Sequence, residues 1–89
     1  MKFVWDDKKA KLNFQKHGVS FDEATSVFFD ILAGTIPDPD HSVGEHRLLT
    51  IGKTTSGRLV VVSHTEGNDI IRIISAREAN RNERKNYES

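Results

Sequence analysis

Three β-rich segments follow one another in the second half of the chain and most constrain its fold. They are residues 47–53, 58–66 and 69–76. Each is rich in valine, isoleucine, leucine or threonine, and turns containing Gly57 and the pair Gly67-Asn68 separate them. Strands joined by such short turns run antiparallel, so this half of the chain predicts a β-meander.

The first 18 residues predict a short strand followed by a helix. Residues 3–5 are apolar and favour an edge strand. Asp6 is a suitable N-cap, and a helix is expected from about Asp7 to His17, with Gly18 as the residue that ends it. Ala10 and Phe14 are expected to supply its contact with the core, beside a polar stripe on the same helix. The stripe comprises Lys9, Asn13, Lys16 and His17.

A second helix and a further strand are predicted before the meander. Ser20 and Glu23 have the spacing of a capping box, and an apolar stripe follows them. The stripe comprises Phe21, Ala24, Val27 and Phe28. Residues 31–36 favour a strand that ends at Pro37 and Pro39. The expected architecture is α+β in one domain, residues 1–89, with an antiparallel sheet of about four strands and a closing helix.

The closing helix is expected to begin directly after the last strand. Residues 70–74 are apolar except for Arg72, and Ser75 and Glu78 again have the spacing of a capping box. If the face that Arg72 is expected to share with Ile70, Ile74 and Ala76 lies under the helices, Arg72 is a buried structural residue. Otherwise Arg72 and Arg77 are presented together beside the sheet.

Charge is distributed unevenly along the chain. Residues 1–45 hold five lysines and eight acidic residues, whereas residues 46–89 hold eight basic and five acidic residues, including all six arginines. Arginine grips phosphate through two parallel hydrogen bonds, so the charge of the second half fits an anion-binding face. It fits an ordinary charged, solvated surface equally well. Cysteine is absent, and neither a signal peptide nor a membrane span is evident, which favours a cytoplasmic protein.

Three other functional patterns are weaker. The segment Gly18-Val19-Ser20 between two helices is typical of a DNA-binding helix-turn-helix, but the second helix is acidic and has no lysine or arginine. A cluster of acidic residues and histidines fits neither a zinc site nor a calcium loop, so no metal and no cofactor is expected. The cluster comprises Asp38, Asp40, His41, Glu45 and His46. His64 is expected to be structural, whereas His17 suits a structural or a catalytic role equally.

Arginines on neighbouring strands suit chemistry on a phosphodiester. Arg47, Arg58 and Arg72 lie on the predicted strands, and Arg77 lies at the last strand's end. Positive groups bind a phosphate and stabilise the charge that develops in its transition state. RNA carries its own nucleophile, the 2′-hydroxyl, so neither a metal ion nor a covalent intermediate is obligatory.

Several blocks of sequence together resemble the BrnT family of toxins. They are Phe3-x-Trp5-Asp6-x-x-Lys9-x-x-x-Asn13-x-x-Lys16-His17-Gly18-Val19-Ser20-Phe21-x-Glu23-Ala24, Asp38-x-Asp40-His41-Ser42-x-Gly44-Glu45-x-Arg47-x-x-x-Ile51-Gly52, Gly57-Arg58-x-x-x-Val62 and Ile71-Arg72-Ile73-Ile74-Ser75-Ala76-Arg77-x-Ala79-x-x-x-Glu83-x-x-x-Tyr87. The resemblance implies a RelE-like fold and a ribonuclease toxin of a type II toxin–antitoxin system that inhibits translation. It also implies a BrnA-like antitoxin, through which alone the chain would meet operator DNA. A homodimer and a toxin–antitoxin heterotetramer both stay open.

The site expected from these considerations combines arginines with a few acid–base groups. Arg72 and Arg77 would bind the scissile phosphate. Further contacts along the RNA would come from Arg47, Arg58, Lys9 and Lys16. The general base or acid would be Glu45 or His17, and Tyr87 would act as an acid, orient a base or simply pack its helix. The main alternative is a non-catalytic module that docks an acidic protein partner through the same basic face.

Overall fold

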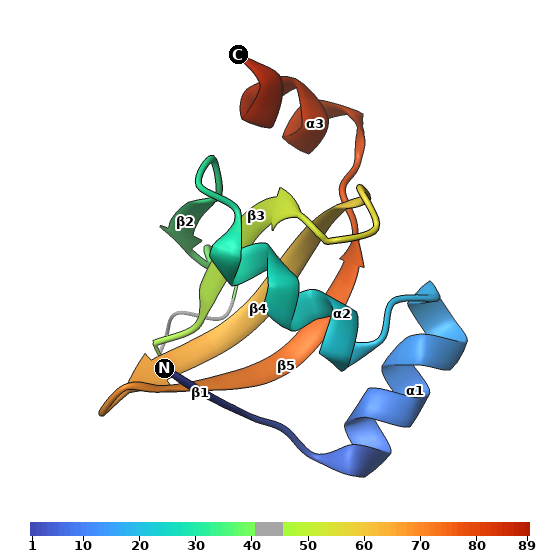
Figure 1. Cartoon of the computed structure of the whole chain (residues 1–89), viewed down its shortest axis with the longest axis vertical. Helices are drawn as coiled ribbons and strands as arrows, with labels where there is room; N and C mark the ends of the chain where they lie inside the picture. Colours follow the sequence, from blue (N-terminus) through green and yellow to red (C-terminus); the bar gives the residue numbers. More distant parts are fainter. Residues whose placement is uncertain (41–45) are drawn as a thin grey trace.

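The computed structural model describes residues 1–40 and 46–89 and has the predicted α+β architecture (Figure 1). In chain order the elements are β1 (Lys2–Val4), α1 (Asp7–His17), α2 (Phe21–Thr25), the 3-10 helix η1 (Ser26–Phe29), β2 (Gly34–Pro37), β3 (Leu48–Lys53), β4 (Leu59–Gly67), β5 (Ile70–Glu78) and α3 (Arg81–Glu88). No helix of the described residues is long and apolar enough to cross a membrane.

The strands form one five-stranded sheet in the order β1-β5-β4-β3-β2. The four strands from β2 to β5 pair antiparallel, which confirms the predicted meander. The N-terminal strand β1 joins the same sheet beside β5 and pairs with it in parallel. The sheet is therefore mixed and has one strand more than the antiparallel set predicted.

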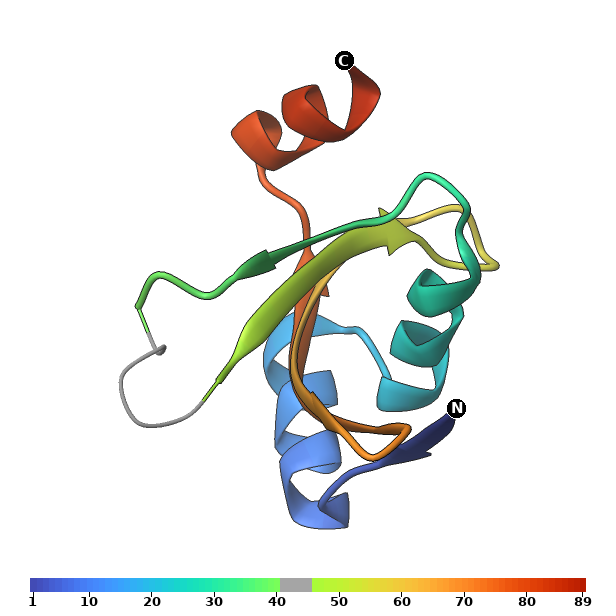
Figure 2. The same ribbon diagram turned by 90° about the vertical axis from the view of Figure 1, so that its left-hand side faces the viewer.

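One face of the sheet is covered by α2 and η1, which supply the core (Figure 2). The main apolar cluster comes from the turn before α2, from these helices and from the facing positions of β4 and β5: Val19, Phe21, Ala24, Val27, Val60, Val62, Ile71, Ile73 and Ala76. Trp5 packs edge-to-face on Phe21, with ring centroids 6.0 Å apart. We call the opposite face of the sheet, turned away from α2 and η1, the open face.

The predicted starts of the first two helices are confirmed, but two details differ. Asp6 caps α1, with its carboxylate accepting from the N–H groups of Lys8 and Lys9, and Gly18 ends it at a φ of 70°. The second helix tightens into the 3-10 helix η1 after Thr25. Phe14, expected in the core, is 56% exposed, because α1 contacts β5 through Asn13 and the next residue points about 100° away from that contact.

The predicted capping box at Ser75 and Glu78 is wrong. Residues 75–78 continue β5 and pair with β4, where Val61 lies opposite Arg77 and Val60 lies opposite Glu78. Pairing with a strand satisfies more backbone groups than a side-chain cap does, so it overrides the local signal. The helix begins later, at Arg81, where Asn80 and Glu83 form the capping box.

A β-bulge decides where the arginines of β5 point. Ser63 pairs with Ser75, but the next residue of β4, His64, pairs with Ile73, so Ile74 is the extra residue. A regular strand would place residues 72 and 77 on opposite faces, since their separation is odd. With the bulge, both arginines lie on the open face.

Burial agrees with this assignment. Ile71, Ile73 and Ala76 are in the core, whereas Arg72 is exposed and Arg77 is half-buried on the other side. Arg72 is therefore not a structural residue under the helices.

Candidate functional site

A shallow cationic groove runs between α1 and the bulged part of β5. Its volume is about 220 Å³, and it is lined by Lys9, Leu12, Asn13, Lys16, His17, Ile74 and Ser75. The side chains of Lys9, Lys16 and His17 are exposed and have no hydrogen-bond or ion-pair partner among the described residues. The structure therefore brings three of the predicted site residues together beside the open face.

Asn13 fixes α1 against β5. Its amide nitrogen donates to Val19 O (3.0 Å) and Ala76 O (2.8 Å), and its oxygen accepts from Ala76 N–H (3.1 Å). The side chain is 7% exposed and pairs with β5 beyond the point where β1 ends. The sequence placed Asn13 in the polar stripe of the helix, but its buried position depends on a contact 63 residues away, which no local pattern reveals.

Arg72 and Arg47 lie toward the other end of the open face. Arg72 pairs with Thr65, and Arg47 directly precedes β3, one residue before the pair Leu48–His64. Arg47 and Arg72 thus lie on opposite sides of Thr65, because β4 runs between β3 and β5. Their backbones are two strand spacings apart, which is on the order of 10 Å. The guanidinium of Arg72 has no hydrogen-bond or ion-pair partner among the described residues.

Arg77 is held by a glutamate of α3. Its Nη1 donates to Glu83 Oε1 and its Nη2 donates to Glu83 Oε2, both at 2.8 Å. Each group favours the charged form of the other, so the pKa of Arg77 is raised and the pKa of Glu83 is lowered. Glu83 was not among the predicted site residues, although Asn80 and Glu83 have the spacing of a capping box.

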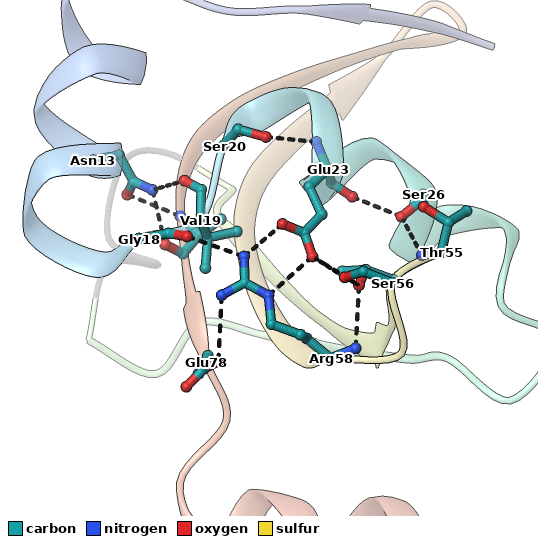
Figure 3. A network of polar contacts seen from close by, with 12 residues as sticks. Asn13, Gly18, Val19, Ser20, Glu23, Ser26, Thr55, Ser56, Arg58 and Glu78 are labelled. Carbon is teal, nitrogen blue, oxygen red and sulfur yellow. Dashed lines mark hydrogen bonds and ion pairs between the residues drawn. The ribbon is translucent and has the colours of Figure 1, made fainter.

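Arg58 lies in a dense polar network on the helix-covered side of the sheet (Figure 3). Its Nε donates to Glu23 Oε2 (3.0 Å), and its Nη2 donates to Glu23 Oε1 (2.5 Å) and to Gly18 O (3.0 Å). A weaker contact joins Nη1 to Glu78 Oε1 at 3.4 Å. The structure does not bring Arg58 to the same face as Arg72 and Arg77.

The Glu23 carboxylate at the centre of this network is strongly stabilised in its charged form. Arg58 is the main cause, and the hydroxyls of Ser56 and Thr54 also donate to it, at 2.6 and 2.9 Å. Together they lower the pKa of Glu23 to about 2. The network joins α2 to the β3–β4 hairpin and to the turn after α1.

Tyr87 lies away from the cationic groove. Its hydroxyl donates to Asp30 Oδ2 at 2.5 Å, which raises the pKa of Tyr87 to about 12. Asp30 also accepts from the backbone N–H groups of Lys53 (2.7 Å) and Leu32 (2.9 Å). Tyr87 therefore fastens the end of α3 to the turn before β2.

His64 is buried, as expected of a structural histidine, but only one of its ring nitrogens has a hydrogen-bond partner, and Nδ1 lies 3.7 Å from Glu66 Oε1. Nε2 bonds Thr50 Oγ1 at 2.7 Å, and Nδ1 has no hydrogen bond among the described residues. Desolvation lowers the pKa of His64 to about 4, so the ring is neutral at pH 7. Phe28 packs on it edge-to-face, with centroids 4.8 Å apart.

Glu45 lies outside the described residues, together with His41 and the rest of residues 41–45. Among residues 1–40 and 46–89, no three histidine, cysteine, aspartate or glutamate side chains gather as a metal site would require. The role predicted for Glu45 as a general base stays a prediction.

Comparisons with known proteins agree with this fold. A model of the family described as "Ribonuclease toxin, BrnT, of type II toxin-antitoxin system" matches residues 5–83. The fold is similar to the 1.1 Å crystal structure of the Brucella abortus ribonuclease toxin BrnT, with a TM-score of 0.70 and 26% sequence identity over 91% of this chain and 99% of that chain. No curated protein matches the sequence.

Proposed function

The chain belongs to the BrnT family of ribonuclease toxins of type II toxin–antitoxin systems, and on this premise we propose that it is a metal-independent endoribonuclease. The observation that carries the proposal is the positive charge of the open face, where the cationic groove beside α1 borders β5, the strand that presents Arg72 and Arg77. Cleavage of RNA in the cytoplasm would inhibit translation.

The reaction that suits this face is internal attack by the RNA. The 2′-oxygen forms a bond to the adjacent phosphorus while the bond from phosphorus to the 5′-oxygen breaks. A base accepts the proton of the 2′-hydroxyl, and an acid protonates the departing 5′-oxygen. The products are a 2′,3′-cyclic phosphate and a 5′-hydroxyl.

Roles follow from where the side chains lie. Arg77 holds the scissile phosphate and stabilises the extra negative charge of the transition state. Arg72 is five residues away, on the order of 15 Å along the strand at about 3.3 Å per residue, and so contacts a flanking phosphate. Arg47 extends the same end of the face, and Lys9 and Lys16 attract the RNA backbone along α1.

His17 is the acid–base group of the proposal within the described residues. It is the last residue of α1 and lines the groove, and histidine is the side chain best suited to proton transfer near neutral pH. Tyr87 fits an acid role poorly, because its proton is held by Asp30. We leave Arg58 out of the RNA-binding face, since Glu23 occupies its guanidinium.

A type II system includes an antitoxin protein as the toxin's partner. We propose that this partner is a BrnA-like antitoxin that neutralises the toxin and carries the operator-binding domain. The toxin itself would then meet operator DNA only within that complex.

The test is cleavage of an end-labelled single-stranded RNA by the purified protein in EDTA. The proposal expects internal cuts that leave a 2′,3′-cyclic phosphate, and a strongly reduced rate for Arg77→Ala at an unchanged melting temperature. Binding of RNA or of an acidic protein without any cleavage would instead support the non-catalytic module. Cleavage by Arg77→Ala at the parent rate would refute the assigned site.

A further inference from the structure

The Arg77 guanidinium is only partly used by its partners. Nη1 donates to Glu83 Oε1 and, more weakly, to Glu78 O at 3.3 Å, and Nη2 donates once, to Glu83 Oε2. A guanidinium has five N–H groups, so Nε–H and the second N–H of Nη2 have no partner among the described residues. These two groups form a side-on fork that fits two oxygens of a phosphate.

Glu83 is itself fixed on both sides. Its Oε1 also accepts from Asn80 N–H at 2.9 Å, and Asn80 in turn accepts from Glu83 N–H at 2.8 Å, which completes the capping box of α3. The Glu83 side chain is 20% exposed, half as much as that of Arg77 at 41%. The first turn of α3 therefore presents the carboxylate to Arg77 in a single orientation.

We propose that Glu83 is a positioning residue that holds the end-on edge of Arg77 and so aims the free edge, Nε and Nη2, at the scissile phosphoryl group. The inference rests on the proposed function and adds a role for α3 in the reaction. An arginine on a flexible stem loses rotamer entropy when it binds a phosphate, and Glu83 removes most of that loss beforehand.

The opposite role for Glu83 is that of a competitor. If it occupied the arginine in place of phosphate, removing its charge would release Arg77 and accelerate cleavage. A purely structural role predicts a third outcome, in which only the stability changes. The three roles therefore differ in the sign and size of the change in kcat.

Glu83→Gln separates positioning from capping. Glutamine at this position still accepts from Asn80 N–H, so the capping box persists, but the paired charge and the second strong acceptor are lost. We expect kcat for RNA cleavage to fall about tenfold, with KM changed less than about twofold. Asn80→Ala is the matched control, because it weakens the start of α3 but leaves Glu83 charged. We expect the melting temperature of Asn80→Ala to fall while kcat of the folded protein stays at the parent value.

Two further measurements make the result specific. In an Arg77→Ala background, Glu83→Gln should cause no further loss of kcat, since the residue acts through Arg77. Relaxation of the ¹⁵Nε of Arg77 should show an ordered side chain in the parent and a disordered one in Glu83→Gln. This second readout needs no catalysis.

The outcomes are distinguishable. Three results would each overturn the positioning role. The first is a rise of kcat in Glu83→Gln, and the second is a loss of kcat from Glu83→Gln that is as large in the Arg77→Ala background as in the parent. The third is an Arg77 side chain that stays ordered in Glu83→Gln. If the parent cleaves no RNA while Arg77 loses order in Glu83→Gln, the proposed function fails and the positioning of Arg77 stands.

Discussion

Two arginine–glutamate pairs lie near Glu78, which accepts a weak hydrogen bond from each arginine. The pairs differ in the edge of the guanidinium that the carboxylate binds. Glu23 binds the Nε and Nη2 edge of Arg58, whereas Glu83 binds the Nη1 and Nη2 end of Arg77. Arg58 also bonds Gly18 O and approaches Glu78, and it has little left for a ligand. Arg77 keeps a complete fork. Similar ion pairs can therefore serve the fold in one place and chemistry in the other.

The largest expected effect is on catalysis at Arg77. Arg77→Ala removes the group that stabilises the transition state, so the single-turnover rate of RNA cleavage should fall on the order of 10²–10³-fold. The unfolding free energy should change little, because the side chain is 41% exposed. A rate within threefold of the parent would show that the free edge of Arg77 has no part in the reaction.

Arg58→Ala should have the opposite profile. It removes three hydrogen bonds to Glu23 and Gly18 and leaves Glu23 with only the hydroxyls of Ser56 and Thr54. Because Arg58 is itself 34% exposed, we expect the unfolding free energy to fall by about 1–2 kcal/mol in urea titrations. The cleavage rate per folded molecule should match the parent rate. A stable Arg58→Ala protein that no longer cleaves RNA would show that Arg58 takes part in the reaction. The two arginine–glutamate pairs would then not differ in function.

The pH dependence of stability tests whether the Arg58–Glu23 pair serves the fold through the charge of Glu23. Its pKa is lowered to about 2 from 4.5, so the stabilisation that it provides is present above pH 4.5 and is lost as the pH falls toward 2. Glu23→Gln should therefore be less stable than the parent by on the order of 2 kcal/mol at pH 6, and the difference should shrink below pH 4.5. A difference that is constant from pH 6 to pH 3 would show that the charge of Glu23 does not matter.

The smallest expected effect concerns two lysines of the same helix. Lys16 lines the groove beside β5, whereas Lys11 lines a separate hollow with Trp5 and Phe14. Lys16→Ala should weaken binding of single-stranded RNA several-fold and reduce the slope of log K against log salt by about 0.7, as one lost phosphate contact requires. Lys11→Ala should leave both unchanged, and equal effects of the two variants would mean that the cationic groove is not where RNA binds.

The sequence predicted the architecture well because its signals are local. Alternating apolar residues, Asp6, Gly18 and Ser20 mark strands and helix ends without reference to the rest of the chain. The capping box at Ser75 failed because pairing with β4 outweighs a cap, and a competing capping box was present at Asn80.

The site was less predictable because it depends on register and on distant partners. The four arginines were identified from the sequence, but the bulge at Ile74 decides that Arg72 and Arg77 share a face. No periodicity distinguishes Arg58 from Arg77. Their partners, Glu23 and Glu83, are 35 residues before one and six residues after the other, and only the folded chain shows which edge each carboxylate takes.

Arg77 has a free edge for phosphate, whereas Arg58 has none. The Nε–H resonances of both arginines can be followed in ¹H–¹⁵N spectra during titration with a 2′-O-methyl RNA, which binds but cannot attack itself. We expect a saturable shift of Arg77 Nε–H with no change at Arg58. A shift at Arg58, or none at Arg77 when the RNA is bound, would contradict this difference between the two arginines.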